Sequence, residues 1–148
     1  MRRPAWIAAA ALAAAFLLLI YYLAGNRNRD AQIALGRATY DIRCATCHGK
    51  ALEGQPNWKT RLTSGRLPAP PHDASGHSWH HPDDVLIGVT KFGLKPYAGE
   101  DYESDMPAFG STLSNSEITA VWSYIKSTWP ERERTFQEEA TERAKKTP

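Results

Sequence analysis

The two cysteines of this chain lie three positions apart, at Cys44 and Cys47, and His48 follows directly. They are the only cysteines among 148 residues, and they are too close together for a disulfide that closes a loop and stabilises the fold. The net charge of +2, without an arginine-rich stretch containing interleaved aromatics, argues against nucleic acid as a partner. A small domain in such a chain has to be stabilised by its own core or by a buried cofactor.

Residues 44–48, Cys-Ala-Thr-Cys-His, form the C-x-x-C-H signature of covalent haem attachment. Two thiols at this spacing can add to the two vinyl groups of one haem, and the adjacent histidine is then held at the iron. A zinc half-site is an alternative, but it requires two further good ligands, and the chain has no second cysteine pair. A thioredoxin-like dithiol typically follows a strand, whereas residues 31–43 predict a helix. The single motif therefore predicts one covalent haem c.

The N-terminal part of the chain is strongly apolar. Residues 7–24 carry no charge, and 18 residues at about 1.5 Å each span roughly 27 Å, about one hydrocarbon core. We expect a single transmembrane helix at 7–24, after a short cytoplasmic N-terminus at 1–6 and before a polar linker at 25–30. A cleaved signal peptide is the alternative, but the apolar run is long and its exit lacks the small residues of a cleavage site. Arginines flank both ends equally, so the orientation rests on the haem motif, because bacteria attach haem to this motif in the periplasm.

The rest of the chain predicts helices joined by loops, without the alternating pattern of strands. After the helix at 31–43, a proline followed by two acids at 81–84 begins a second helix, which Gly93 ends. The sequence 114–117, Ser-Asn-Ser-Glu, is a capping box that opens a third helix to about Thr128.

Two loops and a charged tail complete the chain. Residues 54–81 are rich in proline and glycine and predict a long irregular segment of the kind that lines a site, and residues 95–110 predict a second loop. Residues 130–148 carry opposite charges at i,i+4 spacing, which predicts an exposed helix. This tail has almost no apolar face, and we assign it no function.

The exported part resembles the class I cytochrome c family over residues 32–128. Gly36 and Tyr40 precede the first cysteine by eight and four residues, as the glycine and aromatic of that family's first helix do, and residues 121–126 resemble its last helix. The resemblance implies an all-α domain at 31–129 around one haem, in which these two helices cross nearly at right angles and the glycine admits their close approach. The expected fold is therefore a class I cytochrome c-like helical domain preceded by a single transmembrane helix.

Met106 is the only methionine after the initiator, and it precedes the last predicted helix as the distal methionine does in that family. Pro107 would stiffen the loop that presents its sulfur. We interpret His48 and Met106 as the two axial ligands of the iron. Such a closed coordination shell leaves no site for substrate or oxygen, so it favours an electron carrier over an enzyme. An open distal face would instead indicate a gas sensor or an enzyme.

A ligating histidine usually donates its second ring proton to a neighbouring group. The resemblance implies a proline carbonyl as the acceptor, with Pro70 and Pro71 as equal candidates. It also implies that a loop tryptophan, here Trp79, or a neighbouring imidazole contacts a haem propionate. The histidines of this segment offer an alternative, a separate copper or zinc site. They are His72, His77, His80 and His81.

Charge is unevenly distributed along the exported part. Residues 27–66 hold eight basic and three acidic side chains, whereas residues 83–105 hold six acidic and two basic ones. Such asymmetry predicts a dipole that steers a redox protein.

We therefore predict a membrane-anchored electron carrier of the bacterial inner membrane, with its haem domain in the periplasm. Its partners would be redox proteins, with no small-molecule substrate. The alternative is a haem c subunit fixed within a larger membrane respiratory or dehydrogenase complex.

Overall fold

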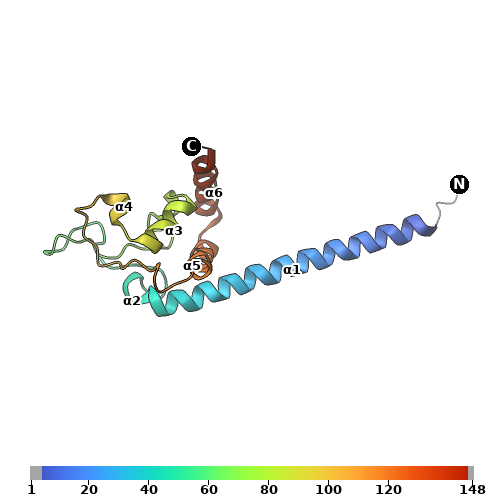
Figure 1. Ribbon diagram of the computed structural model, residues 1–148, viewed down its shortest axis with the longest axis horizontal. Coiled ribbons are helices and arrows are strands. Elements are labelled where there is room, and N and C mark those ends of the chain that lie inside the picture. The colour runs from blue at the N-terminus through green and yellow to red at the C-terminus, as the bar shows by residue number, and fades with distance from the viewer. Residues whose placement is uncertain (1–4, 147–148) are drawn as a thin grey trace. The chain divides into compact units, whose positions relative to one another are not determined.

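The computed structural model describes residues 5–146, without the side chains of residues 5–9 and 11. The described chain is helical and contains no strand, so the predicted all-α class is confirmed (Figure 1). In chain order its helices are α1 (Ala5–Arg43), α2 (Ala45–His48), the 3-10 turn η1 (Ser78–His80), α3 (Asp83–Phe92), α4 (Lys95–Ala98), α5 (Asn115–Thr128) and α6 (Glu131–Lys146).

The chain divides into two compact units, residues 1–32 and residues 33–148. Helix α1 contributes to both and is unbroken, so residues 25–30, for which the sequence predicts a linker, are helical. The physical reason is that this stretch contains no proline, and its one glycine, Gly25, costs only about 1 kcal/mol in a helix. The second unit also extends beyond residue 129, because it includes α6.

The transmembrane helix predicted at 7–24 is not supported by the structure. Among the residues that the structure describes, no helix combines the length and apolar character that a membrane crossing requires. The side chains of residues 7–9 and 11 of the predicted span lie outside the described part.

The core of the second unit forms where the end of α1 meets α5. A Cβ atom at Gly36 would overlap the backbone carbonyl of Ala120, so only glycine allows the two helices to approach so closely. One turn later, Tyr40 is fully buried and its ring packs against Tyr124 with 5.6 Å between centroids. The close approach that the resemblance implied is therefore present, and aromatic rings pack at the same crossing.

The ends of α3 and α5 follow their sequence signals. The Ser114 hydroxyl accepts the backbone N–H of Glu117, whose carboxylate accepts the N–H of Ser114 at 2.8 Å, so the predicted capping box is confirmed. Helix α3 ends at Gly93, whose φ of 81° favours glycine. Pro82 stands just before the first turn of α3 and supplies no side-chain cap.

Helix α6 is correctly predicted as a helix but wrongly predicted as exposed. It packs against η1, and its residues Glu133, Gln137 and Ala140 are buried. The ring of Phe136 meets that of Trp79 edge-on at 5.4 Å between centroids. A pattern search for apolar residues misses this face because polar side chains form most of it.

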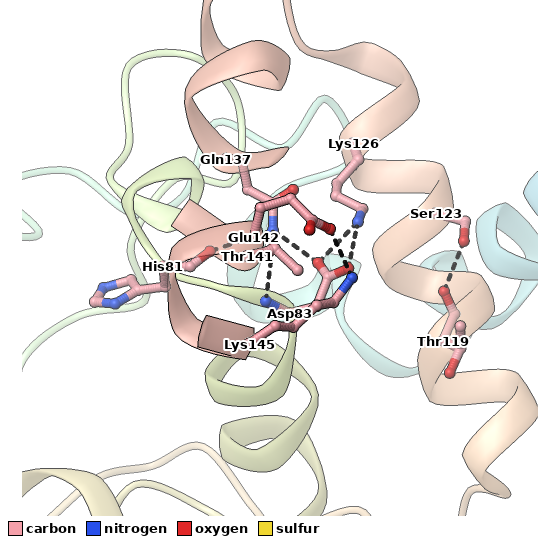
Figure 2. Close-up of polar contacts among 9 residues, drawn as sticks. All are labelled: His81, Asp83, Thr119, Ser123, Lys126, Gln137, Thr141, Glu142 and Lys145. Carbon is pink, nitrogen blue, oxygen red and sulfur yellow. Dashed lines mark hydrogen bonds and ion pairs between the residues drawn. The ribbon is translucent and has the colours of Figure 1, made fainter. Parts of the chain in front are cut away.

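A polar network joins α6 to the start of α3 (Figure 2). The amide of Gln137 donates to the Asp83 carboxylate at 2.7 Å, and the ammonium group of Lys126 donates to the same carboxylate at 2.8 Å. The hydroxyl of Thr141 accepts the backbone N–H of Asp83 at 3.1 Å. Thr141 therefore provides the N-terminal cap that Pro82 cannot supply.

Candidate haem attachment site

The attachment motif folds as a single helical turn, α2, directly after α1. The backbone N–H groups of Cys47 and His48 both donate to the carbonyl of Cys44, at 3.1 and 2.9 Å. In a helix, positions i, i+3 and i+4 share one face. The spacing C-x-x-C-H therefore places the two sulfur atoms and the imidazole on the same side of one turn.

Tyr40 and two glycines hold this turn in place. The hydroxyl of Tyr40 donates to the carbonyl of Gly49 at 2.8 Å, and the N–H of Gly54 donates to the carbonyl of His48 at 2.8 Å. Gly49 ends the turn with a φ of 82°, which side chains other than glycine rarely adopt. The aromatic of the first helix therefore fixes the backbone just after the histidine, in addition to filling the core.

His48 is buried, and its Nδ1 lies 2.9 Å from the carbonyl oxygen of Pro70. A carbonyl only accepts, so Nδ1 carries the proton and Nε2 keeps a lone pair that can bind a metal. Burial lowers the pKa of His48, and the hydrogen bond to Pro70 offsets this only in part, so the ring is neutral at pH 7. Of the two candidate prolines, Pro70 rather than Pro71 lies at hydrogen-bonding distance.

The proline loop is docked onto the segment that follows the motif. A Cβ atom at Gly54 would overlap the backbone of Pro70 and Pro71, and Gly54 has a φ of 67°. Leu52, which is buried, also has a positive φ of 69°, and its carbonyl accepts the N–H of His72 at 2.8 Å. The positive φ angle at Leu52 is a strained backbone conformation, and it occurs where this segment holds the loop that presents the Pro70 carbonyl to His48.

The two thiols are free, and neither forms a disulfide. Cys44 packs against the core, whereas Cys47 is exposed. Burial first, and then the nearby Cys47, raises the pKa of the Cys44 thiol to about 11. Reactive redox cysteines have lowered pKa values, so this environment argues against a thioredoxin-like dithiol.

The ring of His72 stacks on the ring of His48, with 4.1 Å between centroids and 24° between planes. Two imidazoles stacked at this distance could not bind one iron from opposite sides. His72 therefore lies beside His48 and would not be the second ligand if His48 bound the iron in this arrangement. No sequence signal indicates this contact, because nothing in the spacing of the two residues shows which loop covers His48.

The other histidines pair with aromatic rings. His77 stacks on Trp58 at 5.4 Å, and His80 stacks on Trp79 at 3.7 Å between ring centroids. Within the described part of the chain, no three His, Cys, Asp or Glu side chains are grouped so that they could hold a metal ion. The indole N–H of Trp79 donates to the carbonyl of Ala74 at 3.3 Å, a bond with which a haem propionate would compete.

Met106 is half-buried in the loop between α4 and α5, and its neighbours tie that loop down on both sides. Before it, the Asp105 carboxylate pairs with the guanidinium of Arg66. After it, the N–H of Phe109 donates to the carbonyl of Thr90 in α3 at 3.0 Å. The Met106 N–H itself donates to the hydroxyl of Ser104 at 3.0 Å. The loop is therefore anchored on both sides of Met106.

Two free thiols and a neutral imidazole on one helical turn, with the second ring nitrogen already bonded, fit the attachment of a c-type haem. This donor set defines the chain as a cytochrome c domain. More specifically, the chain belongs to the cytochrome c family described as cytochrome c oxidase, cbb3-type, subunit III, which matches residues 31–125. No curated protein matches the chain, and no solved structure matches it.

Membership of this family implies haem-based electron transfer, and its members are typically electron carriers. The motif residues Cys44, Cys47 and His48 are consistent with one covalent haem c. The family match ends within α5, so α6 lies outside it.

Proposed function

We propose that this protein is a single-haem electron carrier in which Cys44 and Cys47 hold the haem and His48 and Met106 ligate the iron. The observation that carries the proposal is the bond from His48 Nδ1 to the Pro70 carbonyl, because it orients Nε2 as a ligand. When bound, the haem supplies one-electron chemistry by cycling between ferric and ferrous iron. The chain's own residues attach it, orient the proximal imidazole and exclude water from its proximal side.

The proposed location is the outer face of a bacterial inner membrane, with redox proteins of a respiratory chain as partners. The family match supports this location and these partners. The proposed attachment to the membrane uses residues 7–24. In its support, the described large apolar side chains of this segment are all exposed and therefore have no core of their own. They are Leu12, Phe16, Leu17, Leu18, Leu19, Ile20 and Leu23.

Membrane attachment is tested by fractionating cells that express the full chain and a variant lacking residues 7–24 fused to a cleavable export signal. The full chain should sediment with membranes and resist washing with high salt and carbonate, whereas the variant should be soluble in the periplasm. Release of the full chain by carbonate would contradict the proposed anchor. Haem staining of both proteins on a denaturing gel reports covalent attachment independently of location.

Axial ligation is tested by replacing Met106. The ferric parent should show the weak far-red absorption of a sulfur–iron bond, and Met106→Ala should lose it and bind carbon monoxide when reduced. Met106→His should restore a six-coordinate haem at lower potential, because a nitrogen ligand favours ferrous iron less than a thioether does. A parent that binds carbon monoxide as fast as the alanine variant would contradict ligation by Met106 and favour a gas sensor or enzyme.

A second candidate function is a haem c subunit fixed within a larger membrane complex. The family description, which names a subunit of an oxidase, favours it. Gentle detergent extraction followed by native mass measurement separates the two functions. A free carrier should migrate as the single chain in its detergent micelle, whereas a subunit should co-migrate with further polypeptides and additional haem.

A further inference from the structure

His72 is a buried histidine to which neither the motif nor the family match assigns a role. Its ring lies against the face of His48, and its Nδ1 lies 2.8 Å from the hydroxyl of Ser78 in η1. The edge of its ring meets Trp122 of α5 at 5.3 Å between centroids. Its carbonyl accepts the indole N–H of Trp129 at 2.6 Å. Side chain and backbone are therefore both fixed, from three separate segments.

A single hydrogen bond does not fix the orientation of an imidazole. The bond from His48 Nδ1 to Pro70 leaves the ring free to tilt about the line between those two atoms. A flat group against the ring face removes that freedom. His72 provides such a group, because its ring lies within 24° of parallel to that of His48.

We propose that His72 is a positioning residue for the proximal ligand: its stacked ring, held by Ser78, fixes the plane of His48 and keeps Nδ1 on the Pro70 carbonyl. This inference rests on the proposed function, in which His48 ligates the haem iron. The consequence is electronic as well as geometric. While the Nδ1–H group of His48 stays hydrogen-bonded to the Pro70 carbonyl, its Nε2 is a stronger electron donor to the iron. Stronger donation stabilises ferric iron and lowers the reduction potential.

The test compares three holoprotein variants. His72→Phe keeps a flat ring and loses the bond to Ser78, His72→Leu loses the flat ring, and Ser78→Ala keeps the histidine but removes its anchor. A control, Ile118→Val, removes a methyl group from the fully buried core of α5 and destabilises the domain without touching the stack.

Two spectroscopic readouts report on His48 directly. The pattern of haem-methyl hyperfine shifts in proton NMR of the ferric protein follows the plane of the axial imidazole. Exchange of the His48 Nδ1 proton follows its bond to Pro70. His72→Leu should change the shift pattern, raise the potential and speed that exchange by about fivefold, the population change expected from losing one ordinary hydrogen bond.

His72→Phe and Ser78→Ala both keep a flat ring and lose the bond to Ser78, so each should move the pattern and the exchange rate in the same direction as His72→Leu but by less. Ile118→Val should lower the melting temperature without moving either readout. An unchanged pattern and exchange rate in both His72→Leu and Ser78→Ala would overturn the proposal. A shift in His72→Phe as large as in His72→Leu would also overturn it, because stacking would then not be the cause.

Failure of the proposed function would have a different signature. If His48 did not ligate the iron, the parent itself would lack hyperfine-shifted signals from the His48 ring. If His72→Leu failed to assemble, His72→Phe and Ser78→Ala would still decide the matter. The proposal requires both to differ from the parent in the same direction, and an unchanged pattern and exchange rate in both would overturn it.

Discussion

The crossing of α1 and α5 and the contact between α6 and η1 both build the second unit, but they use different chemistry. At the crossing, Gly36 removes a side chain so that two backbones can touch, and apolar and aromatic groups fill the rest. At α6, the buried groups are mainly polar, with Gln137 the most buried of them at 1% exposed. The first contact rests on shape, whereas the second rests on satisfied hydrogen bonds.

The polar contact of α6 is sensitive to the loss of any one hydrogen bond. A buried amide costs free energy unless its hydrogen bonds are made. The side-chain nitrogen of Gln137 donates to the Asp83 carboxylate, and its two hydrogens are shared among this group, the Thr141 hydroxyl at 3.0 Å and the His81 carbonyl at 3.3 Å. No buried side-chain nitrogen or oxygen in the described part of the chain is left without a partner. The comparison teaches that α6 is part of the domain, although it lies outside the family match and its sequence resembles a solvated tail.

The largest expected effect comes from Gly36→Ala. The added methyl group overlaps the backbone carbonyl of Ala120, which cannot rotate away, so the helices must separate, at a cost of about 3 kcal/mol. Chemical denaturation of the holoprotein measures this loss. Gly25→Ala is the matched control, because it makes the same change in the same helix, at a position with nothing within 4 Å. Equal stability of the two variants would contradict the close approach.

Gln137→Ala should cost about 2 kcal/mol, because it leaves a cavity and removes a donor from the Asp83 carboxylate. Glu138→Ala, one position along on the exposed side of α6, should change stability by a few tenths of a kcal/mol at most. Amide exchange should also rise at Asp83 and through η1 in the first variant alone. Similar stability of both variants would show that α6 contributes nothing to the stability of the domain.

The features that could be predicted from the sequence differ from the others in the same way: the first depend on local residue patterns, and the others depend on contacts between distant segments. The motif and the capping box at Ser114 depend on a residue type at a fixed spacing, so the sequence alone predicts them. The close approach at Gly36 was implied only by the resemblance. The carbonyl that accepts the ring proton of His48 could be predicted only from the resemblance, and only as that of Pro70 or Pro71. The stack of His72 and the burial of Gln137 depend on how loops and helices meet in space, which no local spacing encodes.

Two further predictions, the linker at 25–30 and the separation of charge, can be compared with the local structure. The predicted linker at 25–30 is helical because polar residues without proline do not break a helix. Arg66, from the basic stretch on which the predicted dipole rests, pairs with Glu103 and Asp105 of the acidic stretch. Charge counts along the sequence place Arg66 and these two acidic residues in separate regions, whereas the loops that carry them meet in space.

A smaller effect is expected from Ser114→Ala, which removes a cap built entirely from local sequence. Loss of this N-cap should cost about 1 kcal/mol at neutral pH. The hydrogen bond from the Ser114 hydroxyl, followed by that from its backbone N–H, lowers the pKa of Glu117. A carboxyl group with a lowered pKa stabilises the folded state above its ordinary pKa, and this contribution is lost as the pH falls through the lowered value.

The stability difference between the parent and Ser114→Ala should therefore be full at pH 7 and should narrow below about pH 4. Urea titrations across this range measure it, with Thr119→Ala on the exposed face of the same helix as the control. A difference that stays constant in acid would show that the carboxylate half of the capping box contributes nothing.

The smallest effect concerns the loop that carries Met106, which an exposed ion pair ties to Arg66. The Asp105 carboxylate raises the pKa of the Arg66 guanidinium, but both groups are solvated, so Arg66→Gln should leave the melting temperature nearly unchanged. Its effect should instead be local: amide exchange at residues 103–106 should rise at low ionic strength. Salt screens the pair, so the parent should approach the variant's exchange rate at about 1 M salt, where the Debye length is roughly 3 Å. Arg143→Gln, which removes another exposed pair, with Glu139 in α6, should leave this loop unaffected. If exchange in the loop were equally slow in Arg66→Gln and the parent at low salt, the loop would be held by its backbone bonds to α3 alone, and surface charge would have no part in presenting the methionine.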